Sequence, residues 1–264
     1  MNLEIKSKTA LVTGSTAGIG LAIAERLLRE GASVIINGRT EDRVEHSVRI
    51  LRDKYTASKV KGFVGDLTDA RERERLYSQF EAIDILINNL GVYESKPLSD
   101  IADSDWLKMF DTNVVSGAAL TRYYLKSMMQ RNWGRIIFIA SETGVNIPAD
   151  MIHYGVSKAA QIALARGIAE LTKGTAVTVN SVLPGPTLSE GVNRYLDSVM
   201  GGANGDRKVL EQNFISTLRP TSLIQRFASS EEVANLVAYL SSPLSSATNG
   251  AAIRVEGGLL RNAV

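Results

Sequence analysis

Short apolar segments alternate along the chain with longer amphipathic ones. The apolar segments are rich in β-branched residues and lack polar alternation, as strands buried on both faces of a sheet do. The amphipathic segments repeat apolar residues at helical spacing, as Ile19, Ile23 and Leu27 do. We expect strands at Thr9–Thr13, Ser33–Asn37, Val60–Val64, Ile83–Asn88, Arg135–Ser141, Val177–Leu183 and Ala252–Val255.

Regular alternation of strand and helix predicts parallel strands joined by right-handed crossovers. The expected fold class is α/β: a single Rossmann-type, doubly wound parallel sheet of about seven strands, with helices on both faces. No repeat or linker divides the chain, so we expect one domain over 1–264. The long irregular segment at 188–225 leaves the carboxyl end of the sixth strand, where such sheets bind ligands, and we predict a substrate lid there rather than a decorative insertion.

Composition and charge exclude several classes of protein. There is no cysteine for thiol chemistry, and two histidines, His46 and His153, are too few for a histidine-rich metal site, so we expect no metal. With 30 basic and 28 acidic residues the net charge is +2, and no basic block matches nucleic acid. No apolar run suits a membrane helix or a signal peptide. We therefore expect a cytoplasmic protein that binds neither nucleic acid nor membrane.

A glycine-rich loop follows the first expected strand. It reads TGSTAGIG over 13–20, with Gly14, Gly18 and Gly20 immediately ahead of a helix. Glycines lack side chains, so backbone N–H groups and the helix N-terminus can approach a pyrophosphate. A plain turn that needs glycine for positive φ is the alternative, but three glycines at this place favour phosphate binding.

The end of the second strand bears on which dinucleotide binds. An NAD site has a carboxylate here for the adenosine ribose, whereas this chain reads Asn37-Gly38-Arg39-Thr40. The planar guanidinium of Arg39 suits a 2′-phosphate, so we expect NADP(H), with NAD(H) possible. A solvated surface arginine is the competing interpretation.

Tyr154 and Lys158 lie four residues apart in a helical pattern that runs from about Asp150 to Lys173. This spacing places both side chains on one helix face. An ammonium beside a phenol favours the phenolate, which makes the pair a candidate general acid and base. Ser141 ends the fifth strand, at the same edge of the sheet. Asn113 lies in a long, otherwise apolar helical segment, where a buried amide needs hydrogen-bond partners.

Together these motifs resemble the short-chain dehydrogenase/reductase family over nearly the whole chain. The C-terminal part, through VEGG at 255–258, is similar to the 3-oxoacyl-carrier-protein reductase branch. The resemblance implies an enzyme that transfers a hydride between a nicotinamide and a carbonyl or secondary alcohol. The motifs are TGSTAGIG at 13–20, NNLG at 88–91, Asn113, Ser141, YGVSK at 154–158 and PGPT at 184–187.

The resemblance also implies catalytic roles for four residues. Tyr154 would protonate the carbonyl oxygen, and Ser141 would hold the substrate oxygen. Lys158 would lower the pKa of Tyr154 and bind the nicotinamide ribose. Asn113 would anchor a water that links Lys158 to solvent.

Contacts with the cofactor follow from the resemblance in the same way. Asp66 would contact the adenine, although a helix N-cap ahead of Thr68 is the alternative. The loop at 184–187 would cover the nicotinamide. The implied contacts are Gly14, Ser15, Thr16, Gly18, Ile19, Gly20, Arg39, Asp66, Leu67, Asn89, Gly91, Tyr154, Lys158, Pro184, Gly185 and Thr187.

Three positions depart from the family's pattern. Leu90 stands where alanine is usual, Glu142 follows Ser141 where a small residue is commoner, and Glu256 replaces the aspartate of VDGG. None of them removes a catalytic residue. The segment at 188–225 is longer than in the carrier-protein reductases, which leaves the substrate open between a small carbonyl compound and an acyl chain.

Three functional hypotheses remain. The first is an NADP(H)-dependent carbonyl reductase or alcohol dehydrogenase with a small-molecule substrate. The second is an NAD(H)-dependent sugar or hydroxy-acid dehydrogenase, against which Arg39 argues. The third is a non-catalytic dinucleotide sensor, which would not need the four catalytic residues. By family analogy we expect a homotetramer or homodimer, formed through the helical segment over roughly 103–131 and the Tyr154 helix.

Overall fold

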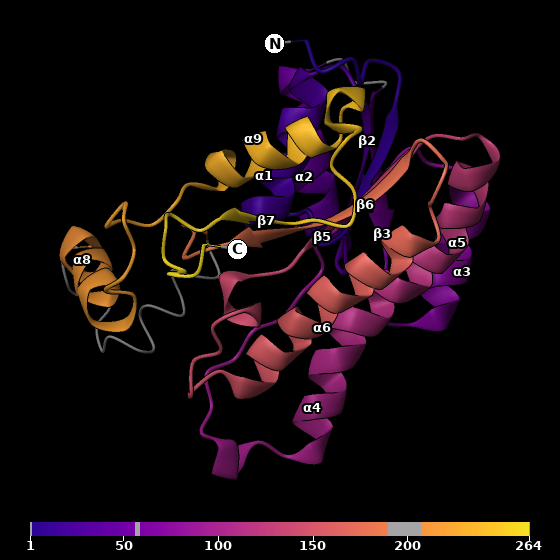
Figure 1. The fold of residues 1–264 in the computed structure, drawn as a ribbon. Helices are drawn as coiled ribbons and strands as arrows, with labels where there is room; N and C mark the ends of the chain where they lie inside the picture. The colour runs from indigo at the N-terminus through magenta and orange to yellow at the C-terminus, as the bar shows by residue number, and fades with distance from the viewer. Residues whose placement is uncertain (1, 56–58, 190–206, 264) are drawn as a thin grey trace.

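The computed structural model describes residues 2–55, 59–189 and 207–263. Its strands form one parallel sheet of order β3-β2-β1-β4-β5-β6-β7 (Figure 1). The predicted doubly wound α/β fold is therefore confirmed, and the expected strand ends agree within two residues. The strands are β1 (Thr9–Val12), β2 (Ser33–Gly38), β3 (Val60–Val64), β4 (Ile85–Asn88), β5 (Gly134–Ile139), β6 (Val177–Pro184) and β7 (Ala252–Val255).

Helices pack on both faces of the sheet (Figure 1). One face carries α1 (Gly18–Arg29), α2 (Glu41–Lys54) and α9 (Ser230–Leu240). The other carries α3 (Ala70–Gln79), α5 (Ser116–Gln130) and α6 (Ile152–Glu170). Because side chains alternate along a strand, Leu11 and Val12 of β1 enter opposite apolar clusters. Two cores of this kind explain why the strands show no polar alternation.

The order of the strands reverses at β1, which pairs with both β2 and β4. Loops leave the carboxyl ends of the strands in opposite directions at such a point and open a crevice for ligands. Asn37, near the end of β2, ties together the carboxyl ends of three strands, β1, β2 and β3. Its Oδ1 accepts from the Gly14 N–H at 3.1 Å, and its Nδ2 donates to the carbonyls of Phe63 at 3.3 Å and Gly65 at 3.1 Å.

The segment over roughly 103–131 is not one continuous helix. It consists of α4 (Asp103–Phe110), a π-helical turn (Asp111–Val115) and α5. A π-turn widens the helix by one residue per turn and redirects the side chains on it. Asn113 lies in this turn and is buried, so the departure from α-helix coincides with a predicted functional residue.

The predicted lid at 188–225 lies partly outside the described residues, which omit 190–206. Its described part includes α8 (Arg207–Leu218), which Figure 1 places at one end of the molecule, away from both helical layers. Across the described ranges, no helix has the length and apolarity that crossing a membrane requires.

The close packing of the glycine loop predicts that alanine destabilises the fold at Gly20 but not at Gly167. A Cβ on Gly20 would lie 2.6 Å from the Gly14 carbonyl oxygen and 2.9 Å from the Ser15 Cα, and neither backbone atom can rotate away. A Cβ on Gly167, which is exposed in α6, meets no described atom within 4 Å apart from its chain neighbours and the nearby backbone of its own helix. We expect Gly20→Ala to lower the free energy of unfolding by about 2 kcal/mol. Gly167→Ala should raise it by up to about 1 kcal/mol, because alanine is the better helix former.

Urea unfolding followed by circular dichroism measures both variants. Equal effects of the two substitutions would contradict the close packing of the glycine loop.

Candidate active site

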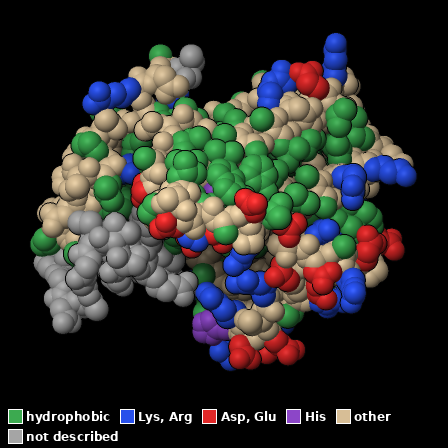
Figure 2. All heavy atoms as spheres, turned by 90° about the horizontal axis from the view of Figure 1, so that it is seen from below, with side chains coloured by type: hydrophobic (Ala, Val, Ile, Leu, Met, Phe, Trp, Pro, Cys, Tyr) green, Lys and Arg blue, Asp and Glu red, His purple; other side chains and the backbone are tan. Residues whose placement is uncertain are grey.

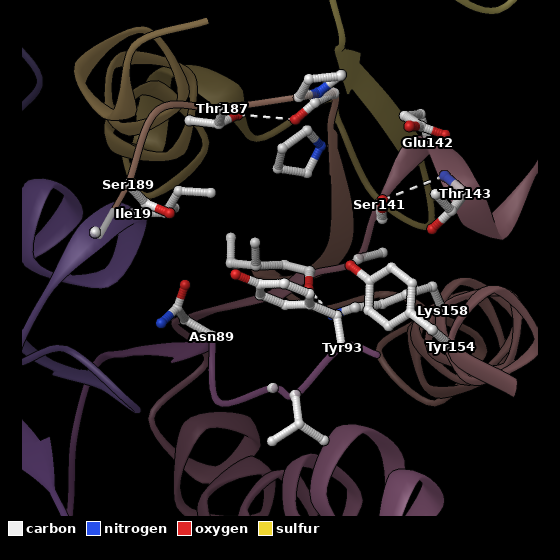
Figure 3. Close-up of a pocket in the computed structure, with 18 of the residues that line it drawn as sticks. Ile19, Asn89, Tyr93, Ser141, Glu142, Thr143, Tyr154, Lys158, Thr187 and Ser189 are labelled. Atoms are coloured by element: carbon white, nitrogen blue, oxygen red, sulfur yellow. Dashed lines mark hydrogen bonds between the residues drawn. The ribbon is translucent and has the colours of Figure 1, made fainter. Parts of the chain in front are cut away.

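A pocket of about 360 Å³ opens at the carboxyl edge of the sheet (Figure 3). Figure 3 shows Ser141, Tyr154 and Lys158 on one side of it, and Ile19 and Asn89 across from them. The predicted site residues that line the pocket are Gly18, Ile19, Gly20, Asn89, Gly91, Ser141, Tyr154, Lys158, Pro184, Gly185 and Thr187. The predicted residues outside its described lining are Gly14, Ser15, Thr16, Arg39, Asp66, Leu67 and Asn113.

The glycine loop fits a pyrophosphate. Gly14 and Gly18 have φ of 59° and 55°, in the left-handed region that favours glycine. No described side chain caps the N-terminus of α1, whereas Asp69 caps α3 and Ser229 caps α9. The first N–H groups of α1 therefore face the pocket without a side-chain acceptor, which is the arrangement that binds phosphate.

Two predicted contacts brace the loop: Ser15, which lies outside the pocket lining, and Asn89, which also lines the pocket. The Ser15 hydroxyl donates to the Val12 carbonyl at 2.6 Å and accepts from the Asn37 N–H at 3.0 Å. The Asn89 amide donates to the carbonyls of Thr13 at 2.9 Å and Gly14 at 3.0 Å. These bonds hold the backbone of the loop in one conformation.

The adenosine end of the site differs in detail from expectation. Arg39 is exposed just after β2, while Arg43, one turn further in α2, lines the pocket. Asp66 Oδ1 accepts from the Thr68 N–H at 3.0 Å and the Thr68 hydroxyl at 2.8 Å. The cap of α3 is Asp69, so Asp66 makes a local turn and is not the helix N-cap. The predicted contact Leu67 packs in the core, with only 1% of its surface exposed.

Ser141, Tyr154 and Lys158 converge from two elements. Ser141 follows β5, and its Oγ accepts from the Thr143 N–H at 3.2 Å. Tyr154 and Lys158 lie one turn apart on α6, with Lys158 Nζ 5.7 Å from the centroid of the tyrosine ring. Nζ donates to the Ile139 carbonyl at 2.8 Å. It also donates to Oε1 of Gln161 at 2.9 Å, so neutral oxygens hold the lysine beneath the tyrosine.

Burial has the largest effect on the pKa values of Tyr154 and Lys158. It raises the pKa of the Tyr154 phenol, and the hydroxyls of Ser141 and Thr143 oppose the rise only in part. Burial also lowers the pKa of Lys158 to about 7. The family resemblance implies that Lys158 lowers the pKa of Tyr154, whereas in this structure desolvation of the phenol outweighs every opposing influence.

Asn113 lies behind the pocket wall. Its Oδ1 accepts from the Val92 N–H at 2.8 Å, and its Nδ2 donates to the Val92 carbonyl at 3.0 Å and to Ser157 Oγ at 2.9 Å. The amide thus joins the segment after β4 to α6, which carries Tyr154. The partners that a buried asparagine needs are all present.

Sequence reasoning missed several residues of the site. Gln161 follows Lys158 by three residues, so helical spacing alone places it on the same face. The Tyr93 ring contacts the Tyr154 ring edge-on, with centroids 6.2 Å apart. Phe214 and Arg219 line the pocket from α8 and just beyond it, and no sequence motif marks them.

Comparison with known proteins defines the class. A family model described as short chain dehydrogenase matches residues 8–198. The chain is 46% identical to the uncharacterized oxidoreductase YvaG of Bacillus subtilis (strain 168) over 262 residues, 99% of each protein. It is 31% identical to the 3-oxoacyl-acyl-carrier-protein reductase FabG of Aquifex aeolicus (strain VF5), over 98% of this chain and 100% of that protein. The chain belongs to the short-chain dehydrogenase family, and the predicted oxidoreductase class is confirmed.

Two solved structures share the fold along their full length. L-sorbose reductase from Gluconobacter frateurii, complexed with NADPH and L-sorbose, superposes with a TM-score of 0.92 at 30% identity and covers 99% of this chain and 100% of its own. A variant of actinorhodin polyketide ketoreductase with NADPH has a TM-score of 0.87 at 30% identity, over 97% and 98% of the two chains.

The buried lysine predicts a pH dependence of stability. Above about pH 7 the folded chain gives up the Lys158 proton, while the unfolded chain keeps it up to a pKa of 10.5. The free energy of unfolding therefore rises with pH in this window. At about 1.4 kcal/mol per pKa unit, the contribution between about pH 7 and pH 9.5 is about 3 kcal/mol. In Lys158→Met the free energy of unfolding should rise by about 3 kcal/mol less between about pH 7 and pH 9.5 than in the wild type. Urea unfolding at the two pH values measures it.

The control is Lys173→Met, which removes an exposed lysine just beyond the same helix. It should keep the wild-type pH dependence. The same slope in wild type and Lys158→Met would show that the lysine is not desolvated.

Proposed function

We propose that the protein is an NADP(H)-dependent oxidoreductase that transfers a hydride between the nicotinamide and a carbonyl compound or secondary alcohol. The observation that carries the proposal is the shared pocket of Ser141, Tyr154 and Lys158 with the uncapped N-terminus of α1. One end of this pocket fits a pyrophosphate, and the other presents an acid to an oxygen atom. A dinucleotide sensor would need only the first.

Ser141, Tyr154 and Lys158 each have a task in the reduction direction. Bound NADPH supplies the hydride. Ser141 Oγ donates a hydrogen bond to the carbonyl oxygen, and the Tyr154 phenol gives that oxygen its proton. The raised pKa of Tyr154 supports this role, because a general acid must be protonated at neutral pH. Lys158, with a pKa of about 7, stabilises the resulting phenolate as an ammonium and exchanges protons near working pH.

The cofactor assignment rests on charge at the end of β2. Arg39 follows β2 directly, Arg43 lies one turn further on in α2, and no carboxylate takes the place that a ribose-binding residue occupies in NAD sites. An arginine fork suits a 2′-phosphate. The NADPH complexes of L-sorbose reductase and of the polyketide ketoreductase support the same choice. We therefore favour NADP(H) over NAD(H).

We further propose a homotetramer or homodimer. Exposed apolar side chains on α4, the π-turn and α5 support it, among them Leu107 at 72%, Val115 at 47% and Tyr123 at 37% exposure. Figure 2 shows hydrophobic side chains gathered on the face of the molecule seen from below. A contiguous apolar surface is typical of protein–protein contact.

Arg39→Asp tests the cofactor assignment. The substitution places a carboxylate where NAD sites have one and repels a 2′-phosphate, so we expect NADPH to bind at least about 10-fold more weakly and NADH more tightly. Titration of cofactor fluorescence gives both dissociation constants. Arg49→Asp makes the same change of charge at an exposed site of α2 away from the pocket, and should leave both values near wild type. Unchanged NADPH affinity in Arg39→Asp would refute the assignment.

Tyr154→Phe tests the reaction. It removes the proposed acid and keeps the ring, so the rate of carbonyl reduction should fall by about 100-fold or more while NADPH still binds. The assay follows NADPH absorbance with a panel of ketones that includes an acetoacetyl thioester. Tyr93→Phe, a change of the same size in the same pocket, should cost far less. Appreciable turnover by Tyr154→Phe would exclude this mechanism, and a wild-type protein inert toward every carbonyl would favour the sensor.

A further inference from the structure

The pocket wall beyond Ser141 carries polar groups that the proposed reaction does not use. Glu142 and Thr143 form a 3₁₀ turn directly after the serine, and both line the pocket with only 3% of their surface exposed (Figure 3). Glu142 Oε2 is buried without a hydrogen-bond partner among the described residues. A buried acceptor without a hydrogen-bond partner destabilises the fold, so we expect a donor from a bound ligand to pair with it.

Two charged groups surround the Glu142 carboxylate. Its Oε1 lies 3.4 Å from Nε of Arg219, whose side chain also lines the pocket. Glu256 is the other, and its Oε2 accepts from the N–H groups of Leu259 and Leu260, so it is bound within its own loop. Burial raises the pKa of Glu142 to about 7, Arg219 lowers it in part, and Glu256 adds to the rise. A hydrogen bond donated to this carboxylate would relieve its desolvation.

The contact between Glu142 and Arg219 is unlike a purely structural ion pair. Arg226 and Glu232 show the structural kind in this chain, with two parallel bonds of 2.9 and 2.8 Å. Arg219 reaches Glu142 through one nitrogen only, and its Nη1 donates to the Leu218 carbonyl at 2.8 Å. The geometry orients the carboxylate and leaves Oε2 for another donor.

We propose that Glu142, oriented by Arg219, accepts a hydrogen bond from a substrate hydroxyl next to the reacting carbonyl, so that the natural substrates are hydroxylated ketones such as ketoses. This inference rests on the proposed function, because it takes the carbonyl oxygen to lie at Ser141 and Tyr154. The Thr143 hydroxyl, which also acts on the Tyr154 phenol, lines the pocket and offers a second contact for the same substrate.

The proposal separates three classes of substrate. A hydroxy ketone gives Oε2 the donor that it lacks. A plain ketone or an acyl thioester would leave this oxygen desolvated and unpaired, which sites built around a hydroxyl group reject strongly. A 2-oxo acid would bring a second carboxylate close to Glu142 and be repelled.

The experiment compares hydroxyacetone with methoxyacetone. The two ketones have similar electron-withdrawing groups, but only the first can donate a hydrogen bond. With NADPH and the wild-type protein, we expect kcat/KM for hydroxyacetone to be at least about 10-fold higher. Pyruvate and an acetoacetyl thioester should be poorer substrates than hydroxyacetone. A wild-type ratio near one for the two ketones would overturn the proposal.

Glu142→Gln tests the residue itself. Arg219 holds the amide oxygen in the place of Oε1, so the NH₂ group takes the place of Oε2 and a donor replaces the acceptor. The ratio of the two kcat/KM values should fall by about 10-fold. Glu231→Gln is the matched control, because Glu231 pairs with Arg29 at the same 3.4 Å on the exposed surface, and it should keep the wild-type ratio.

The outcomes distinguish this inference from the proposed function. If the wild type neither binds NADPH nor reduces a ketone, the proposed function fails. If it reduces ketones and Glu142→Gln lowers both kcat/KM values equally, the pair with Arg219 is only a tether and the inference fails alone. Should Glu142→Gln not fold, Glu142→Asp decides: it withdraws the carboxylate by one methylene, and an unchanged ratio would also overturn the proposal.

Discussion

The pairing of β1 with both β2 and β4 is the constraint on which the rest of the structure depends. It turns the loops on either side of β1 away from each other and opens the carboxyl edge of the sheet. Loop backbone groups at this edge lie outside the ladders of the sheet, so they need other hydrogen-bond partners. Asn37 and Asn89 supply them, since each uses its side-chain amide to bind backbone groups of these loops. The phosphate site is therefore held by side chains that need not touch the ligand.

Desolvation is the second physical effect on which the site depends, and it shifts the pKa values of acidic and basic side chains alike. It lowers the pKa of Lys158 to about 7 and raises the pKa of Glu142 to about 7, so a base and an acid on opposite sides of Ser141 both titrate near neutrality. Neither has a strong ion pair that would fix its charge: Lys158 donates to neutral oxygens, and Glu142 meets Arg219 through one nitrogen. The protonation of such groups can change when a substrate binds, whereas a carboxylate or ammonium held in a fully hydrogen-bonded salt bridge keeps its charge.

Sequence patterns predict what is local or repeated. Seven buried strands, the glycine loop and the spacing of Tyr154 and Lys158 follow from periodicity and residue type, and the parallel pairing of the strands follows from strand–helix alternation. The π-turn around Asn113 does not follow from the sequence pattern, because apolar spacing predicts a helix but does not distinguish an α-helical turn from a π-helical one. A buried asparagine within an apolar helix is the only hint. The contact of Glu142 with Arg219 joins residues 77 positions apart, and no short-range pattern encodes such a pair. Long-range polar contacts were accordingly the part of the site that the sequence did not predict.

The absence of cysteine and the scarcity of histidine fit a division of labour between cofactor and protein. Where a cofactor carries the reactive centre, the protein has to supply one acid, a hydrogen bond that orients the substrate oxygen, and a pocket wall that excludes water. The acid and the contact stand on rigid elements, α6 and the end of β5, whose positions follow from the sheet. Arg219 stands instead directly after α8, a helix that lies away from both helical layers. Substrate choice can therefore change through that segment while the geometry of proton transfer stays fixed, because the two depend on different parts of the fold.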